Sequence, residues 1–122
     1  MTRPRIGYVG VGLMGLPMVK RLAGLGYPVT AFAACPNVAV KISGLGQPGS
    51  PWTVAANRGI VRTVIDLFSP ARCMFASNFP VDSLCASFAT IFGGFRDIVS
   101  DFSSAEQRAL FRDNAIRIYA ME

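Results

Sequence analysis

Two spacings of hydrophobic residues alternate along the chain, and they predict short buried strands connected by amphipathic helices. Apolar runs of strand length lie at 5–9, 27–32, 38–42 and 72–76. Apolar residues recur at helical spacing over 13–25 and 54–68, from 81 to 99, and again after 104. Strands that alternate with helices in this way are typical of an α/β fold.

The helical spacing also predicts which side chains are buried. The expected buried stripes are Val61, Val64, Ile65 and Phe68 in the second helix, Leu84, Phe88, Phe92, Phe95 and Val99 in the third, and Leu110, Phe111, Ala115 and Ile118 in the last. The string Ser103-Ser104-Ala105-Glu106 fits a capping box, in which two side chains bond each other's backbone N–H groups at a helix start. The last helix is therefore expected to begin there.

The second and third predicted strands are too close in the chain to be parallel neighbours. Only residues 33–37 separate them, whereas a parallel crossover needs about a dozen residues or more. The two strands are then antiparallel neighbours, non-neighbours or imperfectly formed. This short joint supports a division of the chain into a first domain at 1–33 and a second at 34–122, which the resemblances below also imply.

Composition restricts the classes of function. The 122 residues suit one small domain, and 52% hydrophobic against 16% charged residues is typical of interior elements of an α/β protein. The net charge of +5 comes from scattered basic residues rather than a run, so nucleic acid is not an expected partner. No segment has the roughly 18 uninterrupted apolar residues of a membrane span, so a membrane is not expected either.

Cysteine and histidine usage narrows the chemistry further. Cys35, Cys73 and Cys85 lack CxxC spacing, and their odd number argues against a disulfide framework. Reduced thiols, and with them a cytoplasmic location, are the expectation. The chain contains no His, which excludes His-based catalytic triads and His metal sites.

One glycine-rich turn has the pattern of a nucleotide site. Gly10-Val11-Gly12-Leu13-Met14-Gly15 fits G-x-G-x-x-G between a predicted strand and a predicted helix. Gly10 would permit the tight turn, Gly12 the approach of a pyrophosphate, and Gly15 close packing of helix on strand. The alternative is a turn that is rich in glycine for structural reasons alone.

The longer string around this turn is more specific. Ile6-Gly7-Tyr8-Val9 precedes it, and Leu16-Pro17-Met18 follows it. Residues 4–32 resemble the start of the 3-hydroxyisobutyrate and 6-phosphogluconate dehydrogenase family. The resemblance implies that Gly10, Gly12, Leu13, Met14 and Gly15 line an NAD or NADP site. After Phe32, however, Ala33-Ala34-Cys35-Pro36 supplies neither the acidic residue nor the Arg that would recognise the ribose.

The rest of the chain resembles a different family. The segments Cys35–Leu45, Phe68–Asp82 and Asn114–Tyr119 resemble, in this order, parts of the amidohydrolase-2 family of TIM-barrel metal-dependent hydrolases and lactonases. The resemblance covers 34–122 and implies the last two β/α units of a barrel. Active-site groups of such barrels lie at the carboxyl ends of the strands.

Four residues are then candidate catalytic groups: Lys41, Ser43, Asn78 and Asp82. The position of Asn78 is an Asp in many relatives, and a neutral Asn cannot act as a general base. The structural alternatives are a solvent-directed side chain for Lys41 and a helix N-cap for Asp82. The family's metal ligands include His residues on earlier strands, so we expect no metal site in this chain.

The sequence therefore predicts an incomplete α/β fold. A βαβ Rossmann start is followed by the last two β/α units of a TIM-barrel-like hydrolase, in one open sheet of about four strands. Three functions stay open: a remnant hydrolase for lactone or amide bonds with little or no activity on a small-molecule substrate, an NAD(P)-binding oxidoreductase fragment, and a non-enzymatic interaction fragment. In the last case, exposed apolar helix faces would promote self-association.

Overall fold

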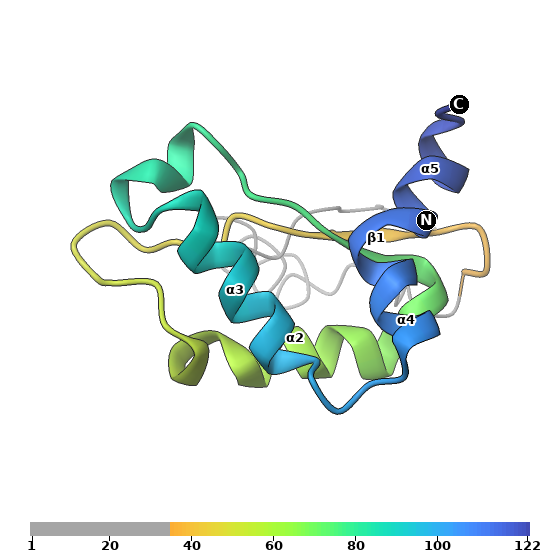
Figure 1. Ribbon diagram of the computed structural model, residues 1–122, viewed down its shortest axis with the longest axis horizontal. Helices are drawn as coiled ribbons and strands as arrows, with labels where there is room; N and C mark the ends of the chain where they lie inside the picture. The colour runs from red at the N-terminus through yellow and green to blue at the C-terminus, as the bar shows by residue number, and fades with distance from the viewer. Residues whose placement is uncertain (1–34) are drawn as a thin grey trace, which may run out of the picture. The chain divides into compact units, whose positions relative to one another are not determined.

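The computed structural model describes residues 35–122 (Figure 1). The chain divides into two compact units, and the second of them, Ala39–Glu122, is described throughout. The predicted strands at 5–9 and 27–32, the helix at 13–25 and the glycine-rich turn lie outside the described residues. The predicted Rossmann start therefore stays a prediction.

The second unit alternates short strands with helices, as the hydrophobic pattern predicts. In chain order its elements are β1 (Val40–Ile42), α2 (Val54–Phe68), the 3-10 helix η2 (Pro70–Arg72), β2 (Cys73–Phe75), the 3-10 helix η3 (Val81–Leu84), α3 (Phe88–Ile98), α4 (Ser104–Arg108), the π-helix η4 (Ala109–Asp113) and α5 (Asn114–Tyr119). The strands are shorter than predicted, and α2 has its predicted bounds.

The two strands form a parallel pair. Val40 lies opposite Cys73, and Ile42 lies opposite Phe75. The connection between them contains α2 and has the length that a parallel crossover requires. Within residues 35–122 the sheet has these two strands. The other two strands of the expected open sheet of about four fall outside the described residues and stay a prediction.

One face of this sheet packs against the helices. Ile42 and Phe75 lie in a core with Ile65 of α2 and with Ile91 and Phe95 of α3. The rings of Phe75 and Phe95 stack with centroids 4.3 Å apart. Since each large side chain that is fully buried contributes about 1.5–3 kcal/mol, these contacts fix the helices on the sheet and hold the strand ends in place.

Helix α3 begins later than the sequence predicts. Its N-cap is Ser87, whose hydroxyl accepts a hydrogen bond from the Thr90 backbone N–H at 3.0 Å. Residues 81–84 form only a 3-10 turn, in which Asp82 makes no capping bond, so the N-cap prediction for Asp82 is wrong. As a consequence, Leu84 and Phe88, predicted to be buried, are 84% and 53% exposed.

The C-terminal helical segment begins at the predicted capping box. The Ser103 hydroxyl accepts from the Glu106 N–H, and the Glu106 carboxylate accepts from the Ser103 N–H at 2.9 Å. Leu110 is buried as predicted, whereas Ile118 lies at the surface.

A buried amide ties this last segment to the strand. The Asn114 side chain donates to the backbone carbonyls of Pro70 at 2.6 Å and Cys73 at 2.7 Å. Because one carbonyl lies in η2 and the other at the start of β2, Asn114 fixes the C-terminal helix to the sheet and to the turn before it.

Candidate functional site

The carboxyl ends of β1 and β2 carry the residues that the sequence singles out. The loops that follow the two strands extend to the same side of the sheet (Figure 1). The first loop contains Ser43, Gly44 and Gly46, and the second contains Asn78 and Asp82. In parallel α/β folds this edge is where functional groups gather.

Asp82 joins the two loops. Its carboxylate is 4% exposed. One oxygen accepts a hydrogen bond from the Asn78 side-chain amide at 2.9 Å, and the other accepts from the Gly46 backbone N–H at 3.3 Å. Both carboxylate oxygens are therefore engaged, and the bond to Gly46 spans the two loops.

Gly46 fits this close approach. A Cβ atom at this position would lie 3.0 Å from the Asp82 carboxylate carbon and 3.0 Å from the Cys85 sulfur. A larger residue would require the side chains of Asp82 and Cys85 to move by a few tenths of an ångström. The sequence singled out Asp82 but not Gly46, because its partner lies 36 positions away in the chain and no local pattern indicates such a contact.

Asn78 has a backbone conformation that few residues tolerate. Its φ is 56°, in the left-handed region where Asn is enriched. Its backbone carbonyl accepts from the Asp82 N–H at 3.0 Å. The residue itself is exposed, so its amide forms the boundary between the buried Asp82 and solvent.

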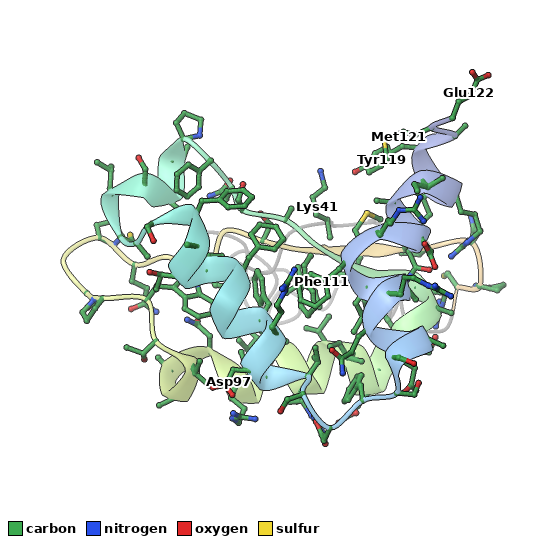
Figure 2. All side chains as sticks on the ribbon, in the orientation of Figure 1. Lys41, Asp97, Phe111, Tyr119, Met121 and Glu122 are labelled. Carbon is green, nitrogen blue, oxygen red and sulfur yellow. The ribbon has the colours of Figure 1, made fainter. Side chains whose placement is uncertain are left out.

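Lys41 and Ser43 are placed differently. Lys41 is the middle residue of β1, where strand alternation directs it away from the helical core. Figure 2 shows it extending to the side of the sheet opposite α2, and its ammonium lies 5.1 Å from the Tyr119 ring centroid. Ser43 is half-buried beside Gly44. Among the described contacts, only Asn78 and Asp82 of the four candidates are hydrogen-bonded to each other.

An aromatic cluster of Phe79, Phe88 and Phe92 lies partly at the surface here, although the sequence predicted Phe88 and Phe92 to be buried. The rings of Phe79 and Phe88 meet edge to face at 5.7 Å, and Phe88 stacks on Phe92 at 4.6 Å. Phe79 is 40% exposed and follows Asn78 directly. The sequence did not predict that these side chains are exposed, because Leu84 and Phe88 continue the spacing of the buried stripe of α3.

The described residues do not fit a zinc site. The sequence has no His, and residues 35–122 contain no group of three or more His, Cys, Asp or Glu side chains that could hold a metal ion. Burial raises the pKa of the Cys73 thiol to about 11, although nearby Arg72 opposes the shift, and this disfavours the thiolate that would bind metal.

A hollow of about 190 Å³ lies beside the loop after β1 and the start of α2. It is lined by Leu45, Gln47, Ser50, Pro51, Trp52, Ala56 and Asn57.

None of the helices between residues 35 and 122 is long and apolar enough to cross a membrane.

Comparison with known proteins gives one consistent family over most of the chain. The family model of amidohydrolases (Amidohydro_2) matches residues 15–121. The uncharacterized protein y4mH of Sinorhizobium fredii is 48% identical over 87 residues, which are 71% of this chain and 29% of that protein. The L-fucono-1,5-lactonase of Burkholderia multivorans is 34% identical over 97 residues, 73% of this chain and 32% of the relative.

A solved structure agrees with these matches. A crystal structure of an amidohydrolase from Burkholderia multivorans with bound zinc has a TM-score of 0.65 and 30% identity, over 74% of this chain and 34% of that one. The chain thus spans about a third or less of the length of these relatives.

A second similarity is to a protein of the dehydrogenase type. A probable 3-hydroxyisobutyrate dehydrogenase-like protein of Arabidopsis thaliana is 28% identical over 79 residues, 63% of this chain and 25% of that protein. The predicted ligands of NAD(P), Gly10 to Gly15, lie outside the described residues, so no geometry bears on them.

Proposed function

The chain belongs to the amidohydrolase family, and from this premise we propose that it is a remnant of a lactone- or amide-hydrolysing enzyme with little or no activity of its own. The observation that carries the proposal is the Asn78–Asp82–Gly46 contact at the carboxyl edge of the two strands. This is the position of active-site groups in β/α barrels. The similarity to a lactonase favours a cyclic ester as the bond class.

The chemistry of the four candidate residues explains the low activity we propose. Ester hydrolysis needs a group that activates water, and Asn78 is neutral at every relevant pH. Asp82 is buried with both oxygens engaged, and Lys41 faces Tyr119. Since no His is present in the chain, neither a general base nor a zinc ligand set is available from these residues.

A turnover assay tests this proposal. The purified full chain is given an aldono-1,5-lactone, and acid release is compared with that of buffer and of the variants Lys41→Ala and Asp82→Asn. We expect all three proteins to match the buffer rate. Hydrolysis by the unchanged chain that is lost in either variant would show a working enzyme and contradict the proposal.

A second candidate function is NAD(P) binding by residues 1–33. It is supported by the G-x-G-x-x-G string and by the similarity to the dehydrogenase-like protein of Arabidopsis. In this interpretation the chain is a chimera of two enzyme families. The test is an amide ¹H–¹⁵N spectrum with and without NADPH: shifts at Gly10 to Gly15 support it, and an unchanged spectrum contradicts it.

The third candidate, an interaction fragment, is supported by the exposed apolar side chains of η3 and of the start of α3. Leu84 and Phe88 are exposed, which favours association of two copies. Sedimentation of the unchanged chain and of Leu84→Ser at several concentrations separates this reading from the others. A cytoplasmic location remains part of the proposal and depends on Cys35, Cys73 and Cys85, whose odd number argues against a disulfide framework.

A further inference from the structure

We propose that Asp82 is a positioning residue that holds the side-chain amide of Asn78 with its oxygen toward solvent. There the amide oxygen accepts a hydrogen bond from a hydroxyl group of a lactone ring. This inference rests on the proposed function for the class of substrate. It assigns the two residues different roles, recognition for Asn78 and orientation for Asp82.

The first step is the direction of the Asn78 amide. A carboxylate has only acceptor oxygens. With the Asn78 nitrogen 2.9 Å from an Asp82 oxygen, the amide N–H must point at Asp82. The opposite orientation would place two acceptors in contact within a buried region, which costs free energy rather than contributing a bond. The hydrogen-bonding network therefore fixes the orientation.

The second step is the direction of the free oxygen. A Cβ atom placed on Gly44 would lie 3.4 Å from the Asn78 amide nitrogen and 3.8 Å from its Cγ, with the amide oxygen beyond 4 Å. The nitrogen side of the amide thus faces both Gly44 and Asp82. Asn78 is exposed, and among the described residues the hydrogen bond of its amide is made by the nitrogen, so the oxygen is the side of the amide left for solvent at the carboxyl edge of the strands.

The third step is the chemistry of the partner. An amide oxygen held in one orientation accepts from an O–H or N–H group, and a hydroxyl group is a donor of this kind. The neighbouring Phe79 contributes an exposed aromatic ring that is supported by Phe88. Small-molecule sites combine apolar and aromatic walls with few fixed polar groups in this manner. A hydroxylated lactone ring offers both a hydroxyl donor and an apolar C–H face.

The orientation is tested by NMR on the full chain, labelled with ¹⁵N only in asparagine. The sequence has four asparagines, Asn37, Asn57, Asn78 and Asn114, and the side chains of Asn57 and Asn114 bond backbone carbonyls elsewhere. We expect Asp82→Ala to shift the Asn78 side-chain signals alone. The matched control Asp97→Ala, at an exposed position of α3, should leave all four pairs unchanged. If the chemical shifts of the Asn78 side-chain NH₂ signals were unchanged in Asp82→Ala, the inference would be overturned.

Recognition is tested on the same samples with an aldono-1,5-lactone. The lactone should shift the Asn78 side-chain pair, and its Kd should rise about three- to tenfold in Asp82→Ala, the effect of losing one oriented hydrogen bond. If Asp82→Ala fails to fold, Asn78→Gly replaces it, since glycine tolerates the positive φ at this position. Asn78→Gly should raise the Kd for the lactone by the same factor. Unchanged affinity in a folded variant, or lactone shifts confined to Asn57 and Asn114, would overturn it. Binding is read without turnover, so failure of the proposed function shows separately, in the acid-release assay.

Discussion

The adjacent glycines Gly93 and Gly94 of α3 allow a stringent test of how this helix packs on Trp52, because an added Cβ atom would contact Trp52 only at Gly94. A Cβ atom on Gly94 would fall 2.1 Å from Cζ3 and 2.6 Å from Cη2 of Trp52, whereas a Cβ atom on Gly93 would meet nothing within 4 Å. Trp52 is 5% exposed and packs edge to face on Phe95 with ring centroids 5.4 Å apart. Gly94→Ala therefore forces the indole out of its place, and Gly93→Ala does not.

The magnitudes follow from two opposing effects. Replacing Gly by Ala inside a helix stabilises it by about 0.8–1 kcal/mol, and this gain is common to both positions. At Gly94 the added methyl group needs the indole to retreat by more than an ångström, because carbon atoms in contact are about 3.5–4.0 Å apart. Overpacking of this kind costs about 1–3 kcal/mol or more. Gly93→Ala should thus be stabilising by up to about 1 kcal/mol, and Gly94→Ala net destabilising.

Urea denaturation followed by tryptophan fluorescence measures the difference. Trp52 is the only tryptophan of the chain, so its emission reports both unfolding and the displacement of the ring. We expect Gly94→Ala to unfold at lower urea than the unchanged chain, with emission shifted to longer wavelength before unfolding. If Gly94→Ala were as stable as Gly93→Ala with unchanged emission, the packing of α3 on Trp52 would be refuted.

Three further predictions concern the rest of the fold. Asn114→Ala removes the donor from the carbonyls of Pro70 in η2 and Cys73 at the start of β2. We therefore expect a loss of about 1–3 kcal/mol or more in urea denaturation, and wild-type stability would contradict the anchoring role. The Cys73 thiol is buried with a pKa of about 11, so at pH 8 a thiol reagent should modify the partly exposed Cys85 first, and equal rates would contradict its burial. Hydrogen bonds from Ser103 lower the pKa of the Glu106 carboxyl. The stability that these bonds give to the folded state is therefore present at pH values above the ordinary Glu pKa, and it is lost as the pH falls through the lowered pKa. Ser103→Ala should therefore destabilise most near neutral pH and progressively less in acid, and a pH-independent effect in thermal unfolding would argue against the pairing.

Local patterns predicted the elements whose stability is local. Helix α2 has its predicted bounds, and the Ser103–Glu106 capping box is confirmed, because an amphipathic stripe and a cap depend on neighbours within a few positions. The start of α3 was missed for the opposite reason. Asp82 bonds Gly46 across the two loops, so residues 81–84 form a separate turn, and Leu84 is exposed despite its regular spacing.

The candidate residues came from the family resemblance and not from the hydrophobic pattern. The resemblance implied Lys41, Ser43, Asn78 and Asp82, and the structure brings Asn78 and Asp82 together after β2; their functional role stays a prediction. The direction of a side chain within a strand depends on its register. Lys41, expected at the strand end, is the middle residue of β1 and lies against Tyr119, a contact between segments far apart in the chain that no motif encodes.

The most direct test of the account is one NMR experiment, in which an aldono-1,5-lactone is added to the ¹⁵N-labelled full chain while acid release is followed in the same tube. The account predicts shifts at the Asn78 side chain and at the Gly46 backbone amide, with lactone consumed no faster than in buffer. Lactone consumption above the buffer rate, or a spectrum that the lactone leaves unchanged at both residues, would contradict it.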